Sequence, residues 1–86
     1  MNELEKQMKA LANRRRLVIL KYLKKKKQTS VGDIAAEIRL SFKSTSRHLS
    51  VLYAVGIVER EQKSLLVFYT LAKQLHKATQ ELLKHI

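Results

Sequence analysis

The chain contains no proline, and its 86 residues include only two glycines, Gly32 and Gly56. Proline and glycine are the residues that most strongly interrupt a helix, so few breaks are imposed on this backbone. A sequence of this kind is expected to be mainly helical. Nothing in it has the composition of a linker, and residues 1–86 are therefore predicted to form one domain.

The net charge of the chain indicates which class of partner it binds. It carries 18 lysines and arginines against 7 acidic residues, a formal charge of +11. Such a charge favours a polyanion, and nucleic acid is the expected partner. A basic protein at a membrane surface is the alternative, although no apolar run reaches the roughly 18 residues of a spanning helix. Residues 1–5 lack the apolar segment of a signal peptide, so a cytoplasmic location is expected.

Apolar residues recur at helical spacing in four segments, and the second to fourth segments each follow a residue that can cap a helix. The predicted helices span residues 3–12, 14–25, 31–38 and 42–55, with Asn13, Thr29 or Ser30, and Ser41 as the caps. Gly56 is expected to end the fourth helix in a left-handed conformation. Because only residues 39–41 join the third and fourth helices, the pair is predicted to be a helix-turn-helix.

The fourth predicted helix has one apolar face and one face that is small, polar and cationic. At 100° per residue the second face gathers Lys43, Ser46, Arg47, Ser50 and Ala54, and it contains no acidic residue. Arginine can donate two hydrogen bonds to guanine, so this face suits the major groove of DNA. The alternative is an ordinary solvated face, which normally carries both charge signs. The predicted DNA contacts are Ser41, Phe42, Lys43, Ser44, Ser46, Arg47 and Ser50.

The helical period stops after Gly56. Residues 57–61 and 65–71 are rich in β-branched, aromatic and aliphatic side chains, and residues 62–64 between them predict a hairpin tip. A basic hairpin after a reading helix is a wing, so the expected fold is a mainly α winged helix-turn-helix with about five helices and a two-stranded wing. Arg60 and Lys63 are predicted to contact phosphate or the minor groove, against the alternative that they are merely solvated.

The last predicted helix carries a long apolar stripe. Its members are Leu71, Leu75, Ala78, Leu82 and Ile86, with Leu83 beside them. The helix either packs on the chain's own core or is shared with a second copy, and the extent of the stripe favours a homodimer. The predicted dimer contacts are Leu4, Met8, Leu75, Leu82, Leu83 and Ile86.

Four consecutive cations, Lys24 to Lys27, close the second predicted helix. They are expected to complement the negative end of that helix's own dipole and to stay hydrated. Contact with phosphate is the alternative function for this run.

Few residues suit catalysis or metal binding. Asp33 is the sole aspartate, and there is no cysteine or glycine-rich phosphate loop, so neither an enzyme nor a cofactor is expected. His76 and His85 fall on opposite faces of a helix and cannot share one ion. Glu81 and His85 share a face, but such pairs are usually plain surface. His48 is interpreted as a histidine at the edge of the core.

Three segments carry a family resemblance. Met8–Leu20 is similar to the pattern L-K-A-L-A-D-P-T-R-L-x-I-L, Leu40–Leu52 to L-S-Q-S-T-V-S-H-H-L-K-V-L, and Val67–Leu71 to V-Y-Y-R-L. In this order they resemble the ArsR-type (ArsR/SmtB-like) winged helix-turn-helix repressors, across nearly the whole chain. The resemblance implies a homodimeric, sequence-specific repressor that binds double-stranded DNA, with dimer contacts from the first and last helices.

The chain also departs from that family pattern. Phe42, Lys43 and Arg47 stand where the family has glutamine, serine and histidine, and Ser64 and Leu65 replace the glycine and arginine common at the wing. The family's cysteine metal site is missing. Two alternatives stay open: a winged-helix module that binds acidic proteins without reading DNA, and a regulator that responds to a small-molecule effector.

Overall fold

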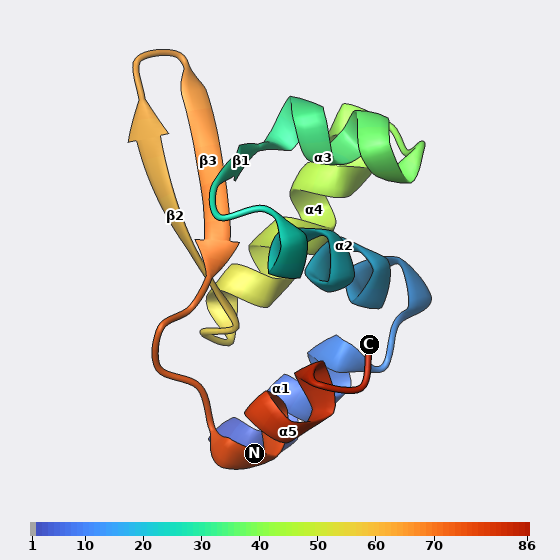
Figure 1. Ribbon diagram of the computed structural model, residues 1–86, viewed down its shortest axis with the longest axis vertical. Coiled ribbons are helices and arrows are strands. Elements are labelled where there is room, and N and C mark those ends of the chain that lie inside the picture. Colours follow the sequence, from blue (N-terminus) through green and yellow to red (C-terminus); the bar gives the residue numbers. More distant parts are fainter. Residues whose placement is uncertain (1) are drawn as a thin grey trace.

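The computed structural model describes residues 2–86, and Met1, which belongs to the predicted domain, lies outside them. The order of the elements is α1 (Glu3–Leu11), α2 (Arg14–Lys25), β1 (Thr29–Ser30), α3 (Val31–Ile38), α4 (Phe42–Ala54), β2 (Val58–Lys63), β3 (Leu66–Leu71) and α5 (Lys77–Leu83). The helix-turn-helix α3–α4 leads into the hairpin β2–β3 (Figure 1). The predicted winged helix-turn-helix fold is confirmed.

The helix boundaries follow from local capping. Three predicted caps accept a hydrogen bond from the backbone N–H three residues later, Asn13 at 3.0 Å, Ser30 at 3.2 Å and Ser41 at 3.1 Å. Thr29, the alternative cap of α3, belongs to β1 instead. α4 gives way to Gly56 with φ at 80°, as predicted. α3 ends at Arg39 with φ at 56°, a left-handed conformation that costs a residue with a Cβ about 1–2 kcal/mol.

The sheet has three strands in the order β1-β3-β2, all antiparallel. The two-stranded prediction missed β1 because a strand of two residues shows no alternation of apolar and polar side chains. β2 also runs further than predicted, since Lys63 pairs with Leu66. The tip of the wing is therefore Ser64–Leu65, where Ser64 has φ at 57°, and not residues 62–64.

The core forms around α2, which contacts α1, α3, α4 and β3. Its Ile19 and Leu20 are fully buried together with Ile34 of α3 and with Leu49 and Leu52 of α4. Burial of an aliphatic side chain of this size contributes about 1.5–3 kcal/mol. These contacts fix the orientation of α4 through its apolar face and leave its polar face outside.

α1 and α5 lie side by side at the end of the molecule away from the wing tip (Figure 1). α5 is shorter than the predicted stripe, because Leu71 belongs to β3 and pairs with Val58. Leu83 is only 6% exposed and packs into the chain's own core. The other predicted dimer residues are half-buried: Leu4, Met8, Leu75, Leu82 and Ile86.

A buried polar contact joins this end to α4. Gln7 of α1 is 2% exposed, and its Nε2 donates to the carbonyl of Val55 at 3.0 Å. Its Oε1 accepts from the hydroxyl of Thr79 in α5 at 2.6 Å. One amide thus links α1, the end of α4 and α5.

A lysine of α2 holds the end of α5. Lys24 Nζ donates to the carbonyls of Leu83 and Ile86 at 2.7 and 3.0 Å. Lys24 lies in the last turn of α2, as predicted, but its ammonium group also binds carbonyl groups at the end of the chain and is not merely hydrated. Within residues 2–86, no helix has the length and apolar character needed to span a bilayer.

Candidate nucleic-acid interface

An open hollow of about 460 Å³ separates α4 from the hairpin β2–β3. α4 lines it with Phe42, Ser46, Ser50 and Tyr53, and the hairpin with residues that include Arg60, Leu65 and Leu66. The structure therefore brings Phe42, Ser46 and Ser50 of the predicted reading helix close to the wing, whereas Lys43 and Arg47 do not line this hollow.

The predicted residues of α4 and its cap differ in accessibility. Ser41, Phe42, Lys43, Arg47 and Ser50 are exposed, and Ser44 and Ser46 are half-buried. Phe42 is 62% exposed, although it is a large apolar side chain. The hydroxyl of Ser41 already accepts from the N–H of Ser44, so it caps the helix. The first turn of α4 contains no acidic residue.

Arg60 of the wing is held against α4. Its guanidinium lies 3.9 Å from the centre of the Tyr53 ring. Stacking of this kind orients an arginine without neutralising it. Arg60 therefore presents a fixed positive charge at the junction of α4 and the wing.

Lys63 is the last residue of β2, and its ammonium group is held by neighbouring side chains. Its Nζ donates to Gln28 Oε1 at 2.9 Å and lies 3.7 Å from a carboxylate oxygen of Glu61. It is also 5.7 Å from the centre of the Phe68 ring. Exposed ion pairs of this type add little stability, but Glu61 partly offsets the positive charge of Lys63.

His48 lies on the inner side of α4. Its Nδ1 is 3.2 Å from Arg16, whose Nε also donates to the carbonyl of Ala10 at 2.5 Å. Burial, followed by the charges of Arg16 and Arg15, lowers the pKa of His48. A neutral imidazole can accept from the arginine, so this contact fastens α4 to α2.

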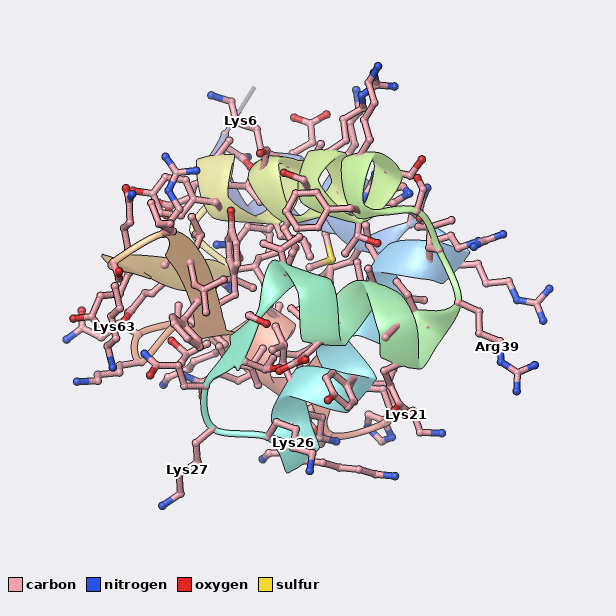
Figure 2. All side chains as sticks on the ribbon, turned by 90° about the horizontal axis from the view of Figure 1, so that it is seen from above. Lys6, Lys21, Lys26, Lys27, Arg39 and Lys63 are labelled. Atoms are coloured by element: carbon pink, nitrogen blue, oxygen red, sulfur yellow. The ribbon has the colours of Figure 1, made fainter. Side chains whose placement is uncertain are left out.

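Sequence reasoning missed Arg39, which is exposed in the turn between α3 and α4. Figure 2 shows its side chain directed away from the body of the domain. One sign of this residue was present in the sequence. An arginine follows the third predicted helix, at the position where a left-handed conformation is common and glycine is the usual residue.

Other cations lie away from α4. Lys21, Lys26 and Lys27 project from the side of the molecule opposite to α4 (Figure 2). They are exposed, and their position favours the solvated interpretation of Lys26 and Lys27 over a phosphate contact.

The two histidines on either side of α5 make surface contacts. His85 Nε2 lies 3.6 Å from Glu81, and His76 Nδ1 accepts from the N–H of Ala78 at 3.1 Å. Over the described residues of the chain, no three side chains of the histidine, aspartate and glutamate type are grouped as a metal site requires.

Known proteins are similar to this chain in sequence and in fold. Residues 13–60 match the family described as bacterial regulatory protein, arsR family. The chain is 39% identical over 79 residues to the transcriptional activator HlyU of Vibrio cholerae serotype O1, a match that spans 92% of this chain and 72% of that protein. The chain belongs to the ArsR family. The predicted resemblance is thus confirmed.

Solved structures of ArsR-family regulators agree. HlyU from Vibrio cholerae has a TM-score of 0.82 at 37% identity and covers 96% of this chain and 89% of its own. A second structure is a homodimeric winged helix-turn-helix DNA-binding domain from Mycobacterium bovis, described as a possible ArsR-family regulator. It has a TM-score of 0.81 at 28% identity, and the match covers 96% of this chain and 73% of the Mycobacterium bovis chain. The chain is a winged helix-turn-helix transcriptional regulator, and a module limited to protein partners is not favoured.

Proposed function

We propose that this ArsR-family regulator binds specific sites in double-stranded DNA as a homodimer. α4 lies in the major groove and the wing lies beside the adjacent minor groove. The observation that carries the proposal is the exposed face of α4, where Lys43, Arg47 and Ser50 stand without an acidic residue, and where Ser50 also lines the hollow beside the wing. An ordinary solvated protein surface carries both positive and negative side chains. A surface that binds the phosphates of DNA carries an excess of positive side chains.

Within this interface the side chains have separate tasks. Arg47 is the long forked donor of the α4 face and reads bases, because two parallel N–H groups match guanine O6 and N7. Ser44, Ser46 and Ser50 adapt to bases or phosphates. Arg39 and Arg60, at either edge of α4, fit phosphates, which position the protein without carrying sequence information.

The α1/α5 end supplies the contact between two copies. Its half-buried apolar residues form a surface that a second copy would cover: Leu4, Met8, Leu75, Leu82 and Ile86. Leu83 supports this surface from inside the core. The homodimeric Mycobacterium bovis domain supports the assignment. The dimer would carry twice +11, or +22, and would place its two α4 helices on half-sites roughly 34 Å apart.

The proposed outcome of binding is repression by occupation of a promoter. No cysteine is present, so a thiolate metal sensor does not belong to the proposal. The Vibrio cholerae relative is named an activator. A reporter driven by the bound promoter, with and without this regulator, distinguishes the two outcomes.

Selection of bound fragments from random duplex DNA tests the reading function. We expect an enriched motif with two related half-sites, whose affinity falls steeply between two salt concentrations. Equal recovery of all sequences would contradict base reading by α4.

Sedimentation at micromolar concentration tests the dimer. We expect a particle of twice 10.0 kDa, or about 20 kDa. A single species of 10.0 kDa would refute the dimer but would not contradict the proposed DNA interface.

A further inference from the structure

The tip of the wing is apolar and uncovered. Leu65 is 93% exposed and Leu66 is 55% exposed. Leu65 occupies a two-residue turn with Ser64, a position where polar residues and glycine are the common choice. Leu65 contributes almost nothing to the packing of the domain, so the fold does not account for it.

The cations of the wing are held below its tip. Arg60 stacks on Tyr53, and Lys63 is bound to Gln28 beside Glu61. The turn itself offers a hydroxyl and an aliphatic side chain. Whatever this tip contacts, it meets first through Leu65.

Leu65 also shares a surface with the reading helix. It lines the same hollow as Phe42, Ser46 and Ser50 of α4, which faces the wing across about 460 Å³ of open space. A hollow between a helix in the major groove and a hairpin beside it is where the intervening sugar-phosphate strand would run. Arg60 in its wall suits that strand, and the wing tip then reaches the minor groove on the far side.

We propose that Leu65 enters the minor groove of the bound duplex as an apolar wedge, with Leu66 packed behind it. The inference rests on the proposed function and adds a determinant of specificity to it. Apolar side chains inserted from the minor groove separate stacked base pairs and bend the duplex toward the major groove. Pyrimidine–purine steps unstack most easily, so the protein would select such a step in the flank of each half-site without a hydrogen bond to its bases.

The test compares the wild type with Leu65→Ala on a selected duplex that carries 2-aminopurine at the flanking step. We expect the wild type to raise the 2-aminopurine fluorescence and Leu65→Ala not to do so. The variant should bind about tenfold more weakly, lose its preference for the flanking step, and keep the wild-type dependence of log affinity on log salt, since no phosphate contact is removed.

Val18→Ala is the matched control. Val18 is an exposed aliphatic residue, 43% accessible, and it does not line the hollow beside α4. It should leave both the fluorescence and the affinity unchanged. Thermal unfolding of each variant checks that the domain stays folded.

Leu65→Arg provides a second readout. An arginine in the groove should steepen the salt dependence by about one phosphate equivalent while the flanking step stays stacked. If Leu65→Ala matches the wild type in affinity, flank preference and fluorescence, or if Leu65→Arg keeps the wild-type salt slope, the wedge is refuted and a protein partner becomes the better explanation of the exposed tip. If the wild type itself binds no selected duplex, the proposed function fails first.

Discussion

The two ends of the domain use polar and apolar side chains in opposite ways. At the α1/α5 end, Gln7 and Thr79 are buried and bonded to each other, and the large apolar residues are at least partly covered. At the α4/wing end Thr45 is fully buried, but Lys43, Arg47 and Ser50 face solvent, and apolar residues as large as Phe42 and Leu65 are exposed.

This contrast separates stability from recognition. A buried hydrogen bond fixes one arrangement of the elements it joins, because leaving its partners unsatisfied is costly. An exposed donor contributes little to folding and is available to a ligand. Changes at the first end should therefore alter the free energy of unfolding, and changes at the second should alter the free energy of DNA binding.

The largest effect is expected for Gln7→Ala. This change leaves the carbonyl of Val55 and the hydroxyl of Thr79 without their partner inside the protein, which should lower the free energy of unfolding by about 2–4 kcal/mol. Urea unfolding measures the loss. Gln74→Ala, at an exposed position, is the control. If Gln7→Ala lowers the free energy of unfolding no more than Gln74→Ala does, the proposed difference between the two ends is wrong.

Arg47→Ala is the matching change at the other end. Loss of the forked donor should weaken binding to the preferred site by about 1–3 kcal/mol and flatten sequence preference, while the free energy of unfolding stays constant. Titration of the preferred duplex and of a scrambled duplex measures both the affinity and the sequence preference. Lys84→Ala removes an exposed cation beyond α5 and should leave binding unchanged. An unaltered preference for Arg47→Ala would mean that α4 does not read the bases.

Arg39→Gly sharpens the comparison, because this residue bears on both properties with opposite signs. Glycine relieves the left-handed strain, so the free energy of unfolding should rise by about 1 kcal/mol. Loss of the cation should weaken DNA binding and lower the salt slope by about one. Arg39→Lys keeps both strain and charge and should resemble the wild type. A stabilised variant with unchanged DNA affinity would remove Arg39 from the interface.

The smallest effect is expected for Lys63→Ala. It should weaken binding to all sequences alike and lower the salt slope by at most about one, since Glu61 already offsets some of the charge. Titrations at two salt concentrations on the preferred and the scrambled duplex measure this. Glu61→Gln should act in the opposite direction. A change in sequence preference for Lys63→Ala would contradict its role as a general phosphate contact.

The same division explains what could be predicted from the sequence. Asn13, Ser30 and Ser41 were predictable as caps because each bonds to a backbone group three residues away. The polar face of α4 was predictable because a helix has a fixed angular period. Both signals are local.

The missed features depend on distant pairs. Gln7 and Thr79 are 72 residues apart, and neither looks like a core residue in the sequence. The carbonyl of Leu83 that Lys24 binds is 59 residues away, so no local pattern in the sequence indicates this partner. The extent of the wing depended on the pairing of Lys63 with Leu66, which shifted the tip to Ser64–Leu65 and brought Leu65 to its apex.

Gly56 connects the two elements that are proposed to contact DNA. In its left-handed conformation, it places the N–H of Ile57 within 3.0 Å of the carbonyl of Leu52, and its own N–H within 3.0 Å of that of Tyr53. The direction of the wing relative to α4 is thereby set by hydrogen-bonded backbone and a buried Ile57 rather than by a loose loop. A protein built in this way has little freedom to follow a groove of a different width. In the proposed complex the duplex would have to deform instead, so the stiffness of the DNA between the two contact points would become one of the properties that the regulator discriminates.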